Sequence, residues 1–395
     1  MFEIVGKYNR AIVYAESVDS ESYAQVLEMC NTERLRNCRI RMMPDMHAAE
    51  GCTVGTSMTV GPEINPSYVG GDIGCGMQVY KINANEMDFS LLDQAIRTSI
   101  PAGAAIHRSA IPIVKQVPLE ELYCYDSLHL DTVVRSLGTL GGGNHFIEVD
   151  KSLQEYYYLI IHSGSRRLGK DIAQHYQNAA FFAANGIHPE EALRKKMKPA
   201  DVKSQIRFDK CFLSGEYKEK YLHDMGVAVK YAELSRKHMG EVILRALHLN
   251  AEDSFVTIHN YVDVENGILR KGAVSAKKGE RLIIPINMRD GCLICEGKGN
   301  TEWNCTAPHG AGRVMKRSEA KCRISLEEYQ AAMKGIYSTS INESTIDESP
   351  MAYRGIDEIM DAIEPTVKID DLSVPVYNFK ASRSSFDEET ADGID

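Results

Sequence analysis

Short apolar runs alternate along the chain with longer amphipathic stretches, a pattern typical of mixed α/β proteins. Runs rich in aromatic and β-branched residues predict buried strands at Tyr156–Ile161, Ser254–Ile258 and Arg281–Pro285. Apolar residues recur at helical spacing from Val227 to Leu249, which predicts a helix with one broad apolar face. We therefore expect a single large α/β (mixed α+β) domain with a central sheet core, covering residues 1–380.

The end of the chain and its overall composition limit the classes of function. Residues 381–395 (ASRSSFDEETADGID) are acidic with few apolar side chains, which predicts a disordered tail. The chain has no apolar run of about 18 residues and no signal-peptide pattern, so we expect a cytoplasmic protein without membrane contact. We therefore expect its ten cysteines to be reduced thiols, with one or two available to bind metal. A net charge of −10 excludes a general nucleic-acid coat but allows a local RNA-binding patch.

Five good metal ligands fall at strand ends or in glycine-rich turns. Asp72 and Cys75 share the turn VGGDIGCGM, His145 follows the glycines of GGGNHFIE, and His162 and His259 end the predicted strands YYYLII and SFVTI. Loops at strand ends are where α/β proteins assemble their sites. The imidazoles and a thiolate able to bridge two ions favour Zn²⁺ or Co²⁺, whereas the carboxylate and open positions also admit Mn²⁺. Two adjacent ions would suit phosphoryl transfer.

A further histidine, His309, lies in the segment APHGAGR. Gly310 and Gly312 are small enough to let a phosphate approach the imidazole, and Arg313 can pair with phosphate oxygens. Attack of this imidazole on phosphorus would give a covalent phosphoramidate. The alternative is a structural turn.

Other motifs are expected to be decoys. Gly164–Asp171 nearly matches a phosphate-binding P-loop, but Asp171 stands where the Mg²⁺-binding hydroxyl is required, so we expect a strand–turn–helix connection. Cys292 and Cys295 have zinc-knuckle spacing within a predicted strand, where residues three apart face opposite sides. The basic run 194–198 (RKKMK) is expected to be a solvated helix face rather than an RNA contact.

Taken together, these segments resemble the RtcB family of RNA ligases. The resemblance runs in order through MPDMHAAEG, YVGGDIGCGM, LGTLGGGNHFIE, HSGSRRLG, HNY, RKGA, APHGAGRVMKR, DESPMAYRGIDE and VPVYNFK, over about residues 40–380. It implies a fold whose active site is built from strand-end loops, and an enzyme that uses two Mn²⁺ ions and GTP.

The resemblance also implies roles for individual residues. The two Mn²⁺ ions are held by the set of five described above: Asp72, Cys75, His145, His162 and His259. His309 is the histidine that GTP guanylylates. The positions that contact the bound nucleotide are Asn144, Glu148 (which reads the guanine edge), Tyr353, Lys380 and Arg313. Arg166 matches an arginine that binds RNA phosphate.

The implied reaction joins RNA ends that carry a 3′-phosphate or 2′,3′-cyclic phosphate to 5′-hydroxyl ends. It passes through a histidine–GMP intermediate and an RNA–ppG end, and it serves RNA repair or tRNA splicing. The partners are then RNA and GTP, and an activating protein is left open. The chain departs from the family pattern at Asn287 and Cys292, where hydroxyl side chains are expected. This departure bears on how GTP is bound.

Two alternative functions share some of these features. A metal-dependent cyclic phosphodiesterase, or an enzyme that caps 3′-ends with GMP without ligation, would use every candidate metal ligand. A non-catalytic RNA-binding protein would need none of them, so the intact ligand set argues against it.

Overall fold

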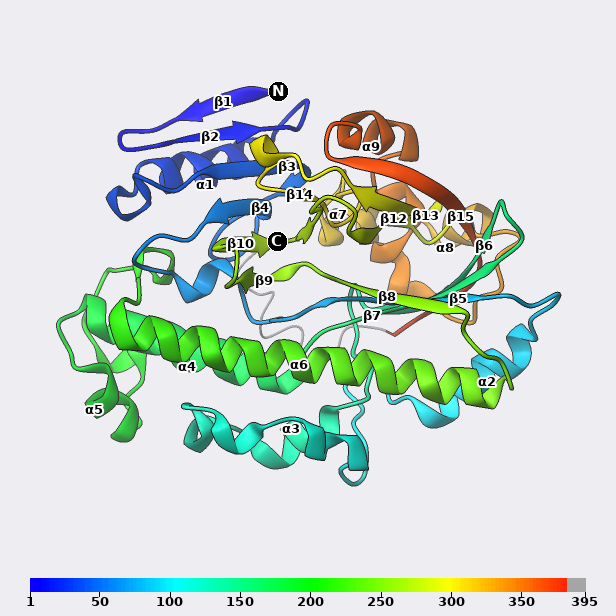
Figure 1. Ribbon diagram of the computed structural model, residues 1–395, viewed down its shortest axis with the longest axis horizontal. Helices are drawn as coiled ribbons and strands as arrows, with labels where there is room; N and C mark the ends of the chain where they lie inside the picture. Colours follow the sequence, from blue (N-terminus) through cyan, green and yellow to red (C-terminus); the bar gives the residue numbers. More distant parts are fainter. Residues whose placement is uncertain (382–395) are drawn as a thin grey trace.

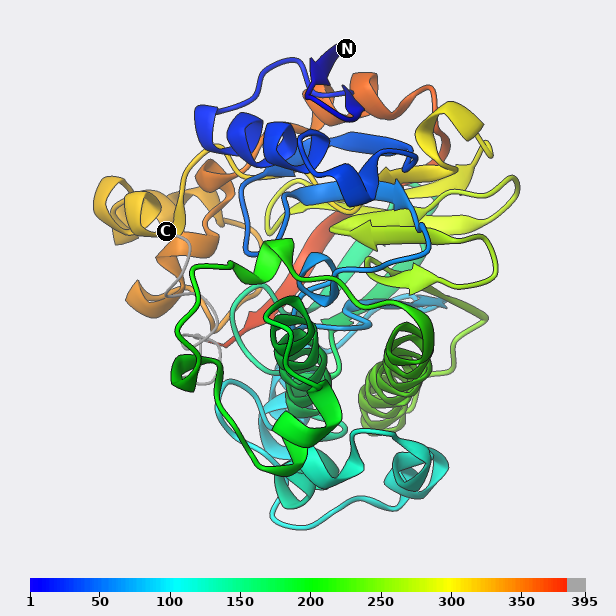
Figure 2. The ribbon, with the colours of Figure 1, turned by 90° about the vertical axis from the view of Figure 1, so that its left-hand side faces the viewer.

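Within the described residues, 1–381, a curled central sheet and a smaller outer sheet lie above a layer of long helices (Figure 1). The view turned by 90° shows the same layering, with two long helices seen nearly end-on below the sheets (Figure 2). The mixed α/β class expected from the sequence is confirmed. The tail predicted at 381–395 lies, apart from Ala381, outside the described residues.

The central sheet is antiparallel and curls until its two edge strands meet. In the described chain its order is β12 (Arg281–Asn287), β13 (Gly291–Gly297), β15 (Val367–Lys380), β6 (Phe146–Ser152), β7 (Tyr157–Ser163), β5 (Gly76–Ile82) and β8 (Asp253–Ile258). Arg281 of β12 donates from NH2 to Oδ1 of Asp253 in β8 at 3.1 Å, which joins the two edges. The enclosed face carries Phe146, Tyr158 and Cys292.

The outer sheet is formed mainly by the N-terminal part of the chain. Its order in the described residues is β1 (Phe2–Val5), β2 (Arg10–Val13), β3 (Ile40–His47), β4 (Val54–Thr59), β10 (Ile268–Lys271) and β9 (Asn260–Asp263), and only the β2–β3 pair is parallel. A short ladder links β11 (Ala273–Ser275) to β14 (Thr306–Pro308).

The helices cover the outside of this β-layer. The α-helices of the described residues are α1 (Ser20–Cys30), α2 (Phe89–Ser99), α3 (Leu130–Ser136), α4 (Arg166–Ala184), α5 (Pro189–Arg194), α6 (Gly215–Ala246), α7 (Arg317–Arg323), α8 (Leu326–Ala332) and α9 (Ile356–Ile363). The helix expected at 227–249 is α6, which begins earlier because Tyr221 and Met225 are also buried in the core. None of the helices in this part of the chain is long and apolar enough to cross a membrane.

Two of the three decoy motifs fold as the sequence predicts. The third, the basic run 194–198, is largely exposed as expected but is not a helix face, because α5 ends at Arg194 and the following residues form a turn. The helix α4 begins at Arg166, so most of the segment Gly164–Asp171 is helical and no phosphate-cradling loop forms there. The buried Asp171 accepts a hydrogen bond at 2.8 Å from the backbone N–H of His129. Both Cys292 and Cys295 lie in β13 and join different apolar clusters, so they do not share a site.

Candidate metal centre and adjacent histidine

The antiparallel register brings the predicted ligands to one edge of the central sheet. Gly76 at the start of β5 pairs with Ser163 at the end of β7 and with Ile258 at the end of β8. Phe146 at the start of β6 pairs with His162. The residues just before β5 and β6 therefore meet the residues that end β7 and follow β8, which are the predicted ligand positions.

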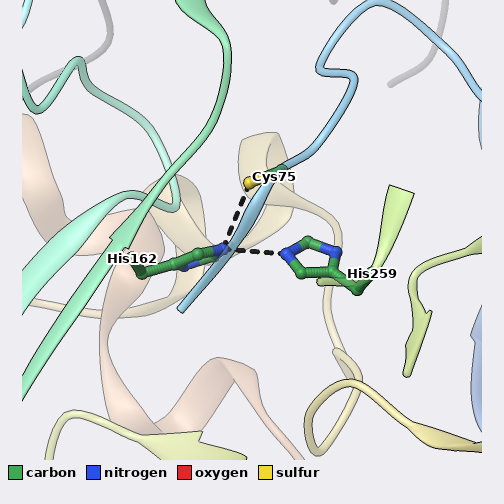
Figure 3. Close-up of side chains that lie close together, drawn as sticks. All are labelled: Cys75, His162 and His259. Atoms are coloured by element: carbon green, nitrogen blue, oxygen red, sulfur yellow. Dashed lines mark hydrogen bonds between the residues drawn. The ribbon is translucent and has the colours of Figure 1, made fainter. Parts of the chain in front are cut away.

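The five candidate ligands form two groups that share the Cys75 sulfur. The ligand atoms of Asp72, Cys75 and His145 lie within 4.8 Å of one another, and so do those of Cys75, His162 and His259. Sγ of Cys75 is 3.4 Å from Nε2 of His145 and 3.3 Å from Nε2 of His162. Figure 3 shows Cys75, His162 and His259 turned toward a common point. The Nε2 atoms of His162 and His259 are 3.0 Å apart.

Backbone carbonyls fix the orientation of two of the imidazoles. Nδ1 of His145 donates to the Leu140 carbonyl at 2.9 Å, and Nδ1 of His162 donates to the Asn144 carbonyl at 3.1 Å. With Nδ1 protonated, Nε2 of each ring presents a lone pair to the shared space, the arrangement common for metal-binding histidines. Nδ1 of His259 is buried without a hydrogen-bond partner.

Burial sets the protonation of these groups. It lowers the pKa of His162 and of His259 well below 6.5, with further lowering by neighbouring histidines, so both rings are neutral. Burial and the neighbouring Asp72 raise the pKa of the Cys75 thiol well above 9.0. A bound cation would favour the thiolate, because a thiol that coordinates a metal is deprotonated. Neutral imidazoles, one thiol and one carboxylate therefore fit a transition-metal site.

Two glycines make room for the side chains around this centre. A Cβ at Gly164 would lie 1.9 Å from Oδ1 of Asp72, and a Cβ at Gly141 would lie 2.0 Å from NH1 of Arg166. Arg166 begins α4 with a φ of 53°, and its NH1 is 3.5 Å from Nδ1 of His145. The structure thus places Arg166 at the edge of the candidate metal centre.

His309 lies beside the metal ligands and is oriented by a buried acid. Its ring centroid is 4.8 Å from that of His259. Nδ1 of His309 donates at 2.7 Å to Oδ2 of Asp45, and its backbone N–H donates to the same oxygen at 3.2 Å. Asp45 is fully buried in β3. With Nδ1 donating, Nε2 of His309 carries the lone pair that a nucleophile needs.

Three predicted nucleotide-binding residues converge on Glu348. Lys380 Nζ donates at 2.5 Å and the Tyr353 hydroxyl at 2.8 Å to Oε2 of Glu348. NH1 of Arg313 donates to the Tyr353 hydroxyl at 2.9 Å, and Arg317 also bonds to Glu348. Burial alone would raise the pKa of Glu348, but Arg317, Lys380 and Arg313 hold it well below 4.5. Arg313 therefore lies in this cluster and hydrogen-bonds to Tyr353.

Glu148 lies instead inside the curled sheet, beside a second carboxylate. Asn378 donates to Glu148, and Oγ of Ser373 donates to Asp150 at 2.7 Å. The Cys292 sulfur is 3.7 Å from Glu148. Burial and the adjacent Asp150 raise the pKa of Glu148 well above 4.5, and burial raises that of Asp150 to about 6. The two side chains cannot readily both be ionised in this interior.

The last predicted nucleotide contact, Asn144, and the departure from the family pattern at Asn287 both lie at turns. Asn144 is exposed, although its carbonyl holds His162. Asn287 uses its own side chain within a turn: Nδ2 donates to Asp290 at 2.8 Å, and Oδ1 accepts from the backbone N–H groups of Arg289 and Asp290. The Asn287 amide is thereby occupied within its turn.

Sequence reasoning missed two residues that organise these sites. Asp45 could have been suspected, since it is the one acid in the largely apolar strand segment IRMMPDMH. Glu348 could not, because it sits in the polar segment INESTIDESP, where nothing indicates burial.

The fold and the site define a mixed α/β protein with a candidate two-ion centre next to a histidine oriented for nucleophilic attack. The family model described as "tRNA-splicing ligase RtcB" matches residues 27–126 and 120–381. The "RNA-splicing ligase RtcB" of Escherichia coli K12 is 33% identical over 368 residues, which cover 84% of this chain and 87% of that protein. The "tRNA-splicing ligase RtcB" of Aeropyrum pernix is 27% identical, over 88% of this chain and 90% of its own length. The chain belongs to the RtcB family of RNA ligases.

Proposed function

We propose that this protein is a GTP- and Mn²⁺-dependent RNA ligase that joins RNA 3′-phosphate or 2′,3′-cyclic phosphate ends to 5′-hydroxyl ends. The observation that carries the proposal is the 4.8 Å between the ring centroids of His309 and His259, because it brings the imidazole that we propose as the nucleophile close to the candidate metal ligands. The names of the relatives, which describe RNA and tRNA splicing, support RNA as the substrate.

We assign one Mn²⁺ ion to Asp72, Cys75 and His145 and the other to Cys75, His162 and His259, because these are the two groups of converging ligand atoms. Such ions supply Lewis-acid chemistry, offsetting the negative charge of phosphate oxygens. The protein holds the imidazoles in the ligating tautomer through the carbonyls of Leu140 and Asn144.

Reducing conditions suit a site built on Cys75, so we expect the enzyme to act in the cytoplasm.

His309 carries the covalent chemistry. Its Nε2 forms a bond to the α-phosphorus of GTP while the bond to the β-phosphate oxygen breaks, giving a histidine–GMP phosphoramidate and pyrophosphate. Asp45 holds the proton on Nδ1 and offsets the positive charge that develops on the ring. An oxygen of the RNA 3′-phosphate then attacks the same phosphorus and displaces His309, which gives an RNA–ppG end.

The second half of the reaction joins the strands. A 5′-hydroxyl oxygen attacks the activated 3′-phosphorus, its proton is lost and GMP leaves. When the RNA end is a 2′,3′-cyclic phosphate, water first opens it to a 3′-phosphate. We assign Arg166 to an RNA phosphate, because its guanidinium lies 3.5 Å from His145 at the edge of the centre.

We assign the nucleotide to the space between the cluster around Glu348 and the Glu148–Asp150 pair. Lys380 connects them, since its Nζ bonds to Glu348 and lies 5.4 Å from the centre of the Phe146 ring, two residues before Glu148 on β6. Asn144, Glu148, Tyr353, Lys380 and Arg313 are the proposed contacts.

Incubation with GTP labelled at the α-phosphate, with and without Mn²⁺, tests the proposal. The expected result is an acid-labile protein–GMP adduct, followed by joining of a 3′-phosphate RNA to a 5′-hydroxyl RNA. An RNA–ppG product without joining would instead identify a capping enzyme, and opening of cyclic phosphate alone a phosphodiesterase. Purified protein that holds no metal and takes no label would point to a non-catalytic RNA-binding protein.

A further inference from the structure

A fully buried arginine lies directly against the candidate metal centre. Arg236 of α6 is 0% exposed, and its NH1 donates to the carbonyls of Gly74 at 2.8 Å and Ser163 at 2.7 Å. Gly74 immediately precedes Cys75, and Ser163 immediately follows His162. One nitrogen of the guanidinium group therefore joins the two chain segments that carry the shared sulfur and one of its histidine neighbours.

Arg236 is unusual among buried arginines because no carboxylate pairs with it in the described part of the chain. Its Nε and NH2 atoms are also buried without hydrogen-bond partners. A buried cation without a partner is costly. The ionisable groups that interact with it electrostatically are Cys75, Glu233 and Asp72, of which Cys75 and Asp72 are candidate ligands. The positive charge of Arg236 therefore lies beside the two candidate ligands that would both be anionic when a cation is bound. An apolar residue would suffice to pack a helix against a sheet.

The close approach of α6 to the sheet makes this contact possible. A Cβ at Gly240, one turn after Arg236, would lie 2.2 Å from the Tyr80 ring of β5. Gly74 has a φ of +72°, and a Cβ there would lie 2.9 Å from the Cα of Val229 in α6. Glycine on both sides of the interface brings the helix close enough for Arg236 to reach the two carbonyls.

We propose that Arg236 is a positioning residue for the metal centre, holding the Gly74 and Ser163 carbonyls so that Cys75 and His162 keep the spacing that a shared ion requires. The inference rests on the metal site of the proposed function and is independent of the ligation chemistry. Outer partners of metal ligands commonly contribute ten- to hundredfold to affinity.

Metal binding by purified variants tests the proposal directly. Co²⁺ serves as the probe, because equilibrium dialysis gives its affinity and the sulfur-to-metal absorption band reports the bond to Cys75. We expect Arg236→Met to lower Co²⁺ affinity by about ten- to hundredfold and to weaken that band. Arg236→Lys should lie in between, since an ammonium keeps the charge without the planar fork. Arg270→Met is the matched control: Arg270 is also 0% exposed, but it bonds to Tyr261, Thr306 and the Asp263 carboxylate.

The following outcomes would overturn the role proposed for Arg236 or the function on which it rests. Wild-type affinity and absorption in Arg236→Met would overturn the proposal, as would an equal loss of affinity per folded molecule in Arg270→Met. If Arg236→Met does not fold, Arg236→Lys decides, and wild-type affinity and absorption in that variant would overturn it. A wild-type protein that binds no Co²⁺ or Mn²⁺ would reject the proposed function itself.

Discussion

Replacing Asp45 with asparagine isolates the electrostatic contribution to the proposed nucleophile. In the structure one carboxylate oxygen of Asp45 accepts two hydrogen bonds, from Nδ1 and from the backbone N–H of His309. The asparagine oxygen can accept the same two bonds, because the two side chains have nearly the same shape. Asp45→Asn should therefore keep the imidazole in place and remove only the negative charge beside it.

The expected decrease in the rate of protein–GMP formation follows from the burial of Asp45 and its hydrogen bond to His309. Asp45 is 0% exposed and its bond to Nδ1 is 2.7 Å, the length of a charge-assisted hydrogen bond. Such bonds contribute about 1.5–3 kcal/mol. Positive charge develops on the ring as Nε2 bonds to phosphorus, so most of this energy is realised in the transition state. We expect Asp45→Asn to slow protein–GMP formation about 10- to 150-fold, at about 1.4 kcal/mol for each tenfold change.

Single-turnover labelling with GTP and Mn²⁺ measures this rate. Metal content should stay at the wild-type level, because Asp45 belongs to neither candidate ligand group. RNA that already carries the ppG end provides the control, since its sealing needs no histidine nucleophile and should proceed at the wild-type rate. Guanylylation by Asp45→Asn at the wild-type rate would refute the role assigned to the Asp45–His309 pair.

Further predictions concern single residues of the site. His309→Ala should abolish GMP labelling while metal content and sealing of RNA–ppG persist, and residual labelling would move the nucleophile elsewhere. Cys75→Ala should lose metal and activity together, whereas Cys295→Ala, in a separate apolar cluster, should cost at most about 1–2 kcal/mol of stability with metal retained. Glu348→Gln should lower the free energy of unfolding at pH 7 by about 3–5 kcal/mol, because it leaves Lys380 and its neighbours unpaired. Since the pKa of Glu348 is depressed below 4.5, urea titrations should show this difference fully above that pH and shrinking as the pH falls below it; a pH-independent difference would contradict the reasoning.

The strands and the mixed α/β class were predictable because their cause is local. The run Tyr156–Ile161 forms β7, which is buried throughout. Ser254–Ile258 forms β8, but its predicted burial is wrong, because β8 is an edge strand in which Ser254 and Val256 are exposed. The beginning of α6 was not predictable from periodicity, because residues 215–226 are largely polar and become helical through tertiary packing of Tyr221 and Met225. The meeting of β12 with β8, which closes the interior, has no local signal either.

The candidate ligands could be identified by residue type and position, but their grouping could not. Nothing in the sequence says that Cys75 lies between His145 and His162, because that depends on which strands are neighbours. The same holds for the acid that orients His309, which is far from it in sequence and reaches it through β3. Long-range pairing of this kind is specified by the fold as a whole.

The arrangement of the candidate metal centre depends on the register of the strands. This dependence explains why a glycine is required at the start of β5. A shift of one residue in the β5–β7 ladder would turn His162 to the opposite face of the sheet and separate it from Cys75. Gly76 supports the observed register, because a Cβ there would lie 2.2 Å from the carbonyl oxygen of Thr257 in β8. Arg236 bonds to the carbonyls of Gly74, which precedes Cys75, and Ser163, which follows His162. Backbone packing therefore sets the spacing of the candidate ligands, and a fixed spacing is the preorganisation that the proposed two-ion site would need.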